Sequence, residues 1–276
     1  MKILFSVTFR SFDKPLERTN QIIFLKSLNK YSSFIDIYAT QFGEKNIKGY
    51  IKKYFKGKIF FKELKNKKFK WSHSIVFSNG LKKYIKSNYD YICWSSSDLK
   101  YNPNVFNYLI KNLEKKNKLF TYFPNISTRT ERSLVEFGLD TFFFKINKIK
   151  AKQMILLLNK YPNYDWGMFE HYLFSLSEIF DLEIINMRKY TNILKFENSR
   201  SKGLVDKQIL SWKKNKLILE KMLIKKKVSI LFSRGSMYYL ALKLFSLKHI
   251  NLNLLYIYML LLIKFIFRLI KGRDYR

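Results

Sequence analysis

Short apolar runs alternate with longer amphipathic segments up to about residue 200, and this alternation is the strongest constraint on the fold. The runs are short and rich in β-branched and aromatic residues, which favours strands. The segments between them can place apolar residues on one face of a helix, as Leu16, Ile22 and Leu25 do in 15–31. The alternation predicts an α/β fold with a mostly parallel sheet that is covered by helices on both faces.

The expected elements can be assigned in order along the chain. Strands are expected at 2–7, 34–39, 58–62, 90–94, 118–123 and 141–146. Helices are expected at 15–31, 71–88, 103–116, 148–160 and 165–178. Ligands of such sheets bind beyond the carboxyl ends of the strands, so the loops that follow the first strand and Trp94 are candidate site segments.

The character of the sequence changes near 197–203, and we expect a domain boundary there, with one domain at 1–203 and a helical, basic and apolar region at 204–276. Its last part, 254–270, is apolar apart from Lys264 and Arg268. This stretch is at the lower limit of the roughly 20 residues that cross a bilayer, and a buried lysine opposes insertion. We therefore expect the region to lie on a membrane surface; a single span and a packed core helix are the alternatives, in that order.

The net charge of +33, from 53 Lys and Arg against 20 Asp and Glu, predicts attraction to polyanions. Nucleic acid, anionic lipid and phosphorylated substrates all qualify. Most aromatic residues fall in apolar runs such as 141–146, which is typical of core and disfavours nucleic-acid binding. The one cysteine, Cys93, excludes an internal disulfide and fits a reducing compartment. It lies in an apolar run and is expected to be a buried, inert thiol.

Asp98 is the clearest candidate for chemistry, because few acidic residues occur and this one follows a strand in "WSSSDLKYNP". A carboxylate at the carboxyl end of a central strand is well placed to ligate Mg²⁺ or Mn²⁺, which would neutralise a nucleotide diphosphate. The alternative is that Asp98 only caps the helix that Pro103 opens. No glycine-rich phosphate loop and no zinc-type spacing of Cys and His occurs in the sequence.

The order of elements and the stretch "SNGLKKYIKSNYDYICWSSSD" resemble the family 2 glycosyltransferases, which have the GT-A fold. The resemblance covers about residues 1–200. In that family a helix with Asn-Gly leads to a strand that ends in a DxD motif, and here Asn79-Gly80 and Ser96-Ser97-Asp98 occupy those places. It implies that Asn79 and Ser96 contact a nucleotide-sugar donor and that Asp98 holds a divalent metal ion, Mn²⁺ or Mg²⁺.

Two departures from the family pattern concern the donor site. Ser96 replaces the first aspartate of DxD, which leaves one carboxylate for the metal. The acidic turn that usually follows the second strand is replaced by "ATQFGEK", in which Gln41 or Glu44 could take over its role.

The resemblance also implies a catalytic carboxylate in "YDWGMFEHYLF", which is similar to the family's WGxED-like segment. An inverting transferase needs a general base that takes the proton from the acceptor hydroxyl. Glu170, which follows the Trp-Gly pair, is the first candidate and Asp165 the second. The alternative is that Asp165 caps a helix. Further on, Arg200 and Lys202 could bind the diphosphate, or belong to a solvated linker.

These features predict a glycosyltransferase of the hexosyltransferase type, inverting, that uses a nucleotide-diphosphate sugar. Its acceptor is expected to be a cell-surface glycan or a lipid-linked precursor in polysaccharide biosynthesis, and its location the cytoplasmic face of the cell membrane. Two alternatives stay open. One is a basic nucleic-acid-binding protein, and the other is a non-catalytic membrane-associated protein with the same fold, which Ser96 in the DxD position makes credible.

Overall fold

The computed structural model describes residues 1–10, 15–42, 47–64, 73–121, 141–160, 169–187, 190–191 and 193–195, and the single positions 259, 263 and 266. The expected boundary at 197–203 lies outside the described residues, as does all but three positions of the region that follows it. That division therefore stays a prediction. No helix in the described part of the chain has both the length and the apolar character that a membrane span needs.

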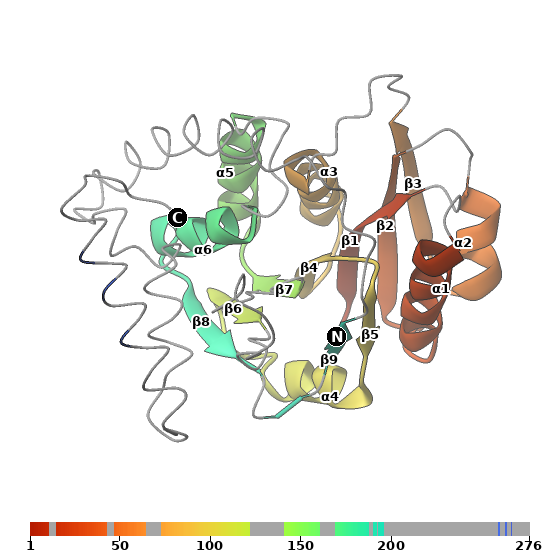
Figure 1. The fold of residues 1–276 in the computed structure, drawn as a ribbon. Helices are drawn as coiled ribbons and strands as arrows, with labels where there is room; N and C mark the ends of the chain where they lie inside the picture. Colours follow the sequence, from red (N-terminus) through yellow and green to blue (C-terminus); the bar gives the residue numbers. More distant parts are fainter. Residues whose placement is uncertain are drawn as a thin grey trace.

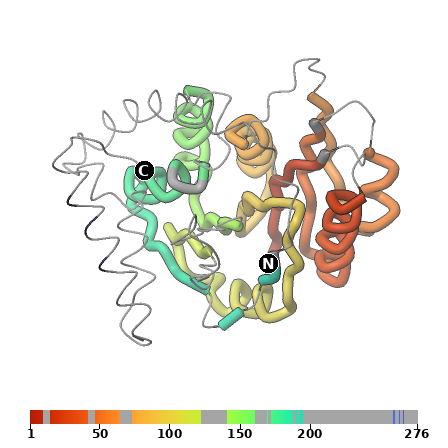
Figure 2. The backbone as a smooth tube through the Cα atoms, in the orientation of Figure 1, coloured from red at the N-terminus to blue at the C-terminus, as the bar shows by residue number. Residues whose placement is uncertain are grey.

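A seven-stranded sheet forms the centre of the described structure (Figures 1 and 2). Its strands, in spatial order, are β3 (Ile59–Leu64), β2 (Ile35–Phe42), β1 (Ile3–Arg10), β4 (Tyr91–Ser95), β7 (Thr141–Lys145), β6 (Lys118–Thr121) and β8 (Glu183–Asn186). The pairs β2–β3, β1–β2, β1–β4 and β6–β8 are parallel, whereas β7 is antiparallel to both β4 and β6. Only β7 of these strands therefore runs against the others, and the predicted α/β class with a mostly parallel sheet is confirmed.

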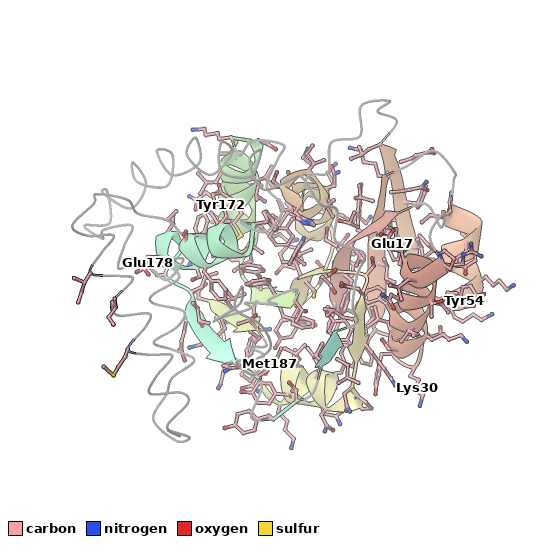
Figure 3. All side chains as sticks on the ribbon, viewed as in Figure 1. Glu17, Lys30, Tyr54, Tyr172, Glu178 and Met187 are labelled. Atoms are coloured by element: carbon pink, nitrogen blue, oxygen red, sulfur yellow. The ribbon has the colours of Figure 1, made fainter. Side chains whose placement is uncertain are left out.

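Helices cover both faces of the sheet, and one apolar cluster lies between the sheet and the helices on each face. One face carries α3 (His73–Ile85), α5 (Lys148–Asn159) and α6 (Phe169–Ile179), and the other carries α1 (Pro15–Asn29), α2 (Lys48–Tyr54) and α4 (Pro103–Lys111). Side chains fill the space on both sides, from Tyr172 on α6 to Glu17 on α1 (Figure 3). Burial on two faces explains why the central strands read as continuous apolar runs.

Several short elements were not expected from the sequence: α2, β8, and a separate antiparallel pair, β5 (Leu99–Tyr101) with β9 (Ile193–Lys195). Each is too short to show a helical or strand period of its own. The helix expected at 103–116 ends at Lys111. Asn117 then takes a left-handed conformation, with φ of 52°, and the chain turns into β6.

α3 packs unusually close to β1, and Gly80 makes this approach possible. A Cβ atom on Gly80 would lie 2.5 Å from both Cβ and Oγ of Ser6. The Ser6 hydroxyl in turn donates to the carbonyl of Val76, at 2.8 Å, so that helix and strand are joined by a buried hydrogen bond. Gly80 thus acts in the packing of helix against sheet.

Replacing Gly80 by alanine is expected to lower the free energy of unfolding by about 1–2 kcal/mol. The overpacking cost of about 1–3 kcal/mol exceeds the gain of up to about 1 kcal/mol in helix propensity. Gly49→Ala is the matched control, because a Cβ there meets nothing within 4 Å. Urea unfolding should show Gly49→Ala unchanged or slightly stabilised, and equal effects of the two substitutions would contradict the close packing.

Candidate functional site

The carboxyl ends of β1, β2, β3 and β4 lie side by side at one edge of the sheet, because these strands are parallel neighbours. α3 follows β3 and precedes β4, so its N-terminus lies at the same edge. Ligands of open α/β sheets bind beyond this edge. The N-terminus of a helix adds free N–H groups and a partial positive charge, both of which favour anions.

Ser96 and Asp98 stand together at this edge, directly after β4. The hydroxyl of Ser96 donates a hydrogen bond to Oδ1 of Asp98. Asp98 is only 4% exposed, whereas Ser96 is half-buried. The two residues that the sequence places at the DxD position therefore form one polar unit at the end of a central strand.

Asp98 does not cap the helix that follows, so this alternative is wrong. The N-cap of α4 is Asn102, whose Oδ1 accepts from the backbone N–H of Asn104 at 3.0 Å. The reason is that β5 lies between Asp98 and the helix and pairs with β9. Capping by Asn102 leaves the position of Asp98 without an explanation in helix stability.

A chain of buried side chains lies directly behind the Ser96–Asp98 turn. Tyr101 Oη is 2.8 Å from Ser95 Oγ and 2.6 Å from Thr141 Oγ1. The Cys93 sulfur lies 3.6 Å from the same threonine hydroxyl. Burial raises the pKa of the Tyr101 phenol well above its ordinary value, although the hydrogen bonds with Ser95 and Thr141 lower it. Tyr101 therefore keeps its proton and can donate.

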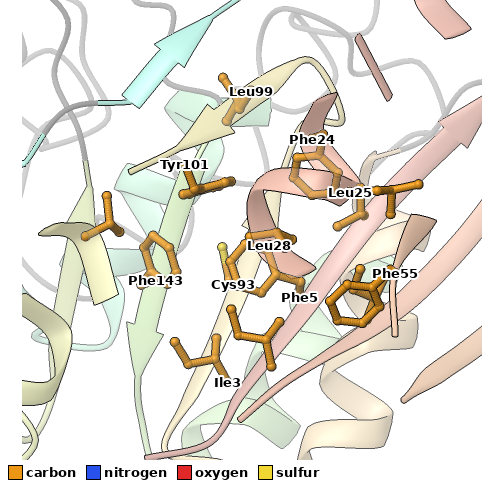
Figure 4. Close-up of a cluster of buried hydrophobic side chains, with 14 of the residues drawn as sticks. Ile3, Phe5, Phe24, Leu25, Leu28, Phe55, Cys93, Leu99, Tyr101 and Phe143 are labelled. Carbon is orange, nitrogen blue, oxygen red and sulfur yellow. The ribbon is translucent and has the colours of Figure 1, made fainter. Parts of the chain in front are cut away.

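Cys93 is a buried, inert thiol, as its apolar context predicts. Its side chain lies in the cluster between the sheet and α1 (Figure 4). Burial raises the pKa of this thiol far above its ordinary range. A thiolate is the reactive form, so Cys93 has no role as a nucleophile.

Asn79 belongs to a second polar group, on the α3 face of the sheet. Thr8, Thr40 and Lys62 pair in register across β1, β2 and β3 and so share one face. Asn79 Oδ1 accepts from Lys62 Nζ at 3.2 Å. Asn79 Nδ2 and Thr40 Oγ1 are buried and have no hydrogen-bond partner among the described residues. Buried polar atoms of this kind call for a partner, such as water or a ligand.

No described contact joins Asn79 to the Ser96–Asp98 turn. The second polar group extends across three strands, from Lys62 on β3 through Thr40 on β2 to Thr8 on β1. β1 is the direct neighbour of β4, so one strand spacing, about 5 Å, separates Thr8 from β4, and three spacings, about 14 Å, separate Lys62 from it. The edge therefore offers two polar groups, which one extended ligand could reach together.

Gln41 has a structural role in the described part of the chain. Its side chain is fully buried, and its Oε1 accepts from the backbone N–H of Ile47, at 2.9 Å, where α2 begins. It lies next to Thr40 on β2 and so points to the opposite face. Glu44, the other residue that could replace the acidic turn after the second strand, lies outside the described residues.

The start of α6 lies against the end of β4 through an aromatic contact. The rings of Phe169, His73 and Trp94 are 5.2–5.6 Å apart, centroid to centroid. The indole N–H of Trp94 is buried and finds no acceptor among the described residues. Because Glu170 follows Phe169 directly, its backbone lies near the same end of β4.

The other candidate residues Asp165, Arg200 and Lys202 lie outside the described part of the chain, as does the side chain of Glu170. The structure adds six polar residues that were not singled out from the sequence: Thr8, Thr40, Lys62, Ser95, Tyr101 and Thr141. Tyr101 and Thr141 are 40 positions apart, and no local pattern connects them.

The donor set at the turn fits a divalent ion that phosphate oxygens help to hold. Asp98 supplies one carboxylate, and Mg²⁺ commonly binds to one or two carboxylates together with substrate phosphates and water. No cluster of three or more His, Cys, Asp or Glu side chains that could enclose an ion by itself occurs among the described residues.

The solved structures that this chain resembles in fold include transferases of different kinds. A fragment of S. aureus TarS in complex with UDP-GlcNAc is 12% identical, with 87% of this chain and 76% of that chain covered and a TM-score of 0.49. The mannosyltransferase PcManGT from Pyrobaculum calidifontis, with GDP-Man and Mn²⁺, is 9% identical over 82% and 64%, with a TM-score of 0.44. A cytidylyltransferase from Leptospira borgpetersenii is 13% identical over 91% and 98%, with a TM-score of 0.43.

In a longer TarS structure, with 11% identity and a TM-score of 0.46, this chain matches 46% of the length of that protein. These likenesses concern the fold and transfer no substrate or reaction. No protein-family model matches the sequence, and the search of curated proteins found no match.

Proposed function

We propose that this chain is a glycosyltransferase that takes a sugar from a nucleotide-diphosphate donor. The observation that carries the proposal is the Ser96–Asp98 unit at the carboxyl end of β4, where the sequence resembles a DxD motif. The position is that of ligands in open α/β sheets, and helix capping does not account for it. Asp98 is the residue that would hold Mn²⁺ or Mg²⁺ against the donor diphosphate.

The donor would lie along the edge between the two polar groups. Its diphosphate faces the Ser96–Asp98 turn, and its other end approaches Asn79 and Lys62 on the α3 side. The ammonium of Lys62 suits a phosphate or a polar base edge. Arg200 and Lys202 are proposed to close on the diphosphate. The excess of basic residues would raise the local concentration of such an anionic donor.

The transfer step would use one carboxylate as general base. The acceptor hydroxyl loses its proton to Glu170 or Asp165 as its oxygen attacks the anomeric carbon, and the nucleotide diphosphate leaves, with inversion. The contact of Phe169 with Trp94 supports this assignment, because it holds the backbone of Glu170 near the end of β4. A cell-surface glycan or a lipid-linked precursor of a polysaccharide is the proposed acceptor.

Attachment to the cytoplasmic face of the membrane is proposed for the C-terminal region. Met259, Ile263 and Ile266 are helical and 46–55% exposed. Their spacing of four and three residues places them in one stripe. An apolar stripe in a basic segment is typical of a helix that lies in the membrane interface.

Nucleic-acid binding is the weaker alternative. Among the described residues Tyr190 is the one aromatic side chain that is largely exposed, at 53%, so a platform for stacking bases is lacking in that part of the chain. Nucleotide binding and sugar transfer by the parent chain and by the three site variants below distinguish an enzyme from a non-catalytic protein with the same fold.

Asp98→Asn should leave the fold intact and weaken Mn²⁺-dependent binding of UDP or GDP by at least about tenfold, because the ion loses its charged ligand. Thermal-shift titration with and without Mn²⁺ measures this. Asp36→Asn is the control: Asp36 accepts from the Tyr89 hydroxyl in the first half of β2, away from the carboxyl edge. Unaltered nucleotide affinity in Asp98→Asn would remove the metal assignment.

Glu170→Gln and Asp165→Asn test the general base. One of them should retain donor binding and lose on the order of 100-fold in sugar transfer, because the acceptor proton has no base. Glu178→Gln, about two turns further along α6, should transfer normally. Transfer at the parental rate in both site variants would show that the base lies elsewhere.

The intact chain should sediment with membranes, and deletion of 251–276 should release much of it. Replacing Met259, Ile263 and Ile266 by serine should lower binding to anionic vesicles at least about tenfold, through the loss of apolar burial. High salt should release only part of the intact chain, because apolar contacts are not screened. Full solubility of the intact chain at low salt would contradict this attachment.

A further inference from the structure

Three hydroxyl side chains form a buried chain behind the candidate metal ligand. Ser95 is the last residue of β4, Tyr101 the last of β5, and Thr141 the first of β7. Ser95 Oγ lies 2.8 Å from the carbonyl oxygen of Ser96, and Tyr101 Oη bridges Ser95 and Thr141 at 2.8 and 2.6 Å. All three side chains are buried.

The direction of these hydrogen bonds follows from counting protons. A carbonyl oxygen only accepts, so Ser95 donates its one proton to Ser96. Tyr101 must then donate to Ser95, and Thr141 must donate to Tyr101. The bonds therefore run one way, from β7 through β5 to the backbone of the turn, and such chains strengthen each member.

The Tyr101 ring is held by its own packing, which fixes its hydroxyl. It meets Phe5 and Phe143 edge to face, with centroids 5.4 and 6.2 Å apart, and Phe106 at 6.0 Å. Figure 4 shows Tyr101 in this cluster, next to Phe143 and close to Cys93. The packed Tyr101 ring thus holds its hydroxyl in place to donate to Ser95, the residue just before the Ser96–Asp98 turn.

The chain closes the loop that carries Asp98. Ser95 and Tyr101 flank residues 96–100, so the bond between their side chains joins the two ends of this short segment. Ser95 also holds the Ser96 carbonyl, while the Ser96 hydroxyl binds the Asp98 carboxylate. Every link from Thr141 to Asp98 is therefore a described hydrogen bond or a peptide connection.

We propose that Tyr101 and Thr141 are positioning residues of the nucleotide site. Their hydroxyls fix the segment 95–101, which contains the Ser96–Asp98 turn, and thereby fix the Asp98 carboxylate. Neither residue touches the ligand. The functional half of this inference rests on the proposed role of Asp98, whereas the order of the turn can be measured without any nucleotide. Groups that orient a metal ligand commonly contribute about 10–100-fold to affinity or activity.

Tyr101→Phe removes one hydroxyl and keeps the ring, and Tyr91→Phe is its matched control. Tyr91 is also buried, and its hydroxyl donates to the Leu109 carbonyl at 2.9 Å, at the other end of β4. Each variant removes a buried hydroxyl that has two hydrogen-bond partners, and for Tyr91 the second is the Asn112 carbonyl at 3.3 Å. Similar losses of stability are therefore expected. Only Tyr101→Phe should weaken Mn²⁺-dependent UDP or GDP binding, by about tenfold.

Thr141 offers a conservative pair of substitutions for the other end of the chain. Thr141→Val removes the donor and keeps the shape, and it should reproduce the effect of Tyr101→Phe. Thr141→Ser keeps a hydroxyl and should bind nucleotide within about threefold of the parent, since the donor is restored. Equal binding by Thr141→Val and the parent would overturn the role of Thr141.

Hydrogen exchange of the full-length protein, measured on peptides that cover 95–101, separates the two possible failures. Tyr101→Phe should speed exchange there by about tenfold. Tyr91→Phe should leave the exchange of these peptides unchanged. Unchanged exchange in Tyr101→Phe overturns the inference, whatever the nucleotide data show. A turn that loosens while nucleotide affinity stays constant also overturns it. A parent protein that binds neither UDP nor GDP with Mn²⁺ contradicts the proposed function and the functional half of the inference, while exchange still decides whether the hydroxyls order the turn.

Discussion

Burial of β1 on both faces is the constraint on which the rest of the structure depends. Ile3, Phe5 and Val7 belong to the cluster under α1, whereas Leu4 belongs to the cluster under α3. β1 also pairs with β2 along its whole length and with β4 over five positions. β1 therefore fixes the register of its two neighbouring strands and is the surface on which both helical layers pack. The position of the carboxyl edge follows from this.

The two polar groups at this edge are supported from opposite sides of the sheet. Tyr101 and its partners belong to the α1 side, where the aromatic cluster holds them. Asn79 and Lys62 lie on the α3 side, where Gly80 lets the helix approach β1. Binding of a ligand that spans the edge would depend on the packing of both layers, because each layer positions one end of the candidate site.

The sequence predicted what depends on long, regular burial and missed what depends on short or distant contacts. The strands at 2–7, 34–39 and 90–94 were predictable because burial on two faces leaves continuous apolar runs. The position of Asp98 just beyond the end of β4 was predictable because this residue follows such a run, whereas its role as a metal ligand stays a prediction. The three-residue strand β5 left no periodic signal, and so the capping role considered for Asp98 was wrong.

The contact between Tyr101 and Thr141 could not be predicted from the sequence. It exists because β7 runs against its neighbours, so that its first residue lies beside the last residue of β4. Strand direction is a property of the whole chain path, and a window of a few residues does not encode it. The same holds for Asn79 and Lys62, whose contact needs α3 and β3 to be placed in three dimensions.

The burial of Cys93 gives this protein an internal reporter of core opening. It is the only thiol in the chain, it lies in the middle of β4 with no exposed surface, and its thiolate is strongly disfavoured. An alkylating reagent can reach it only when β4 separates from the layer beneath α1. The labelling rate of the unmodified protein therefore counts the openings of the strand that ends at the candidate site, with no probe to be engineered.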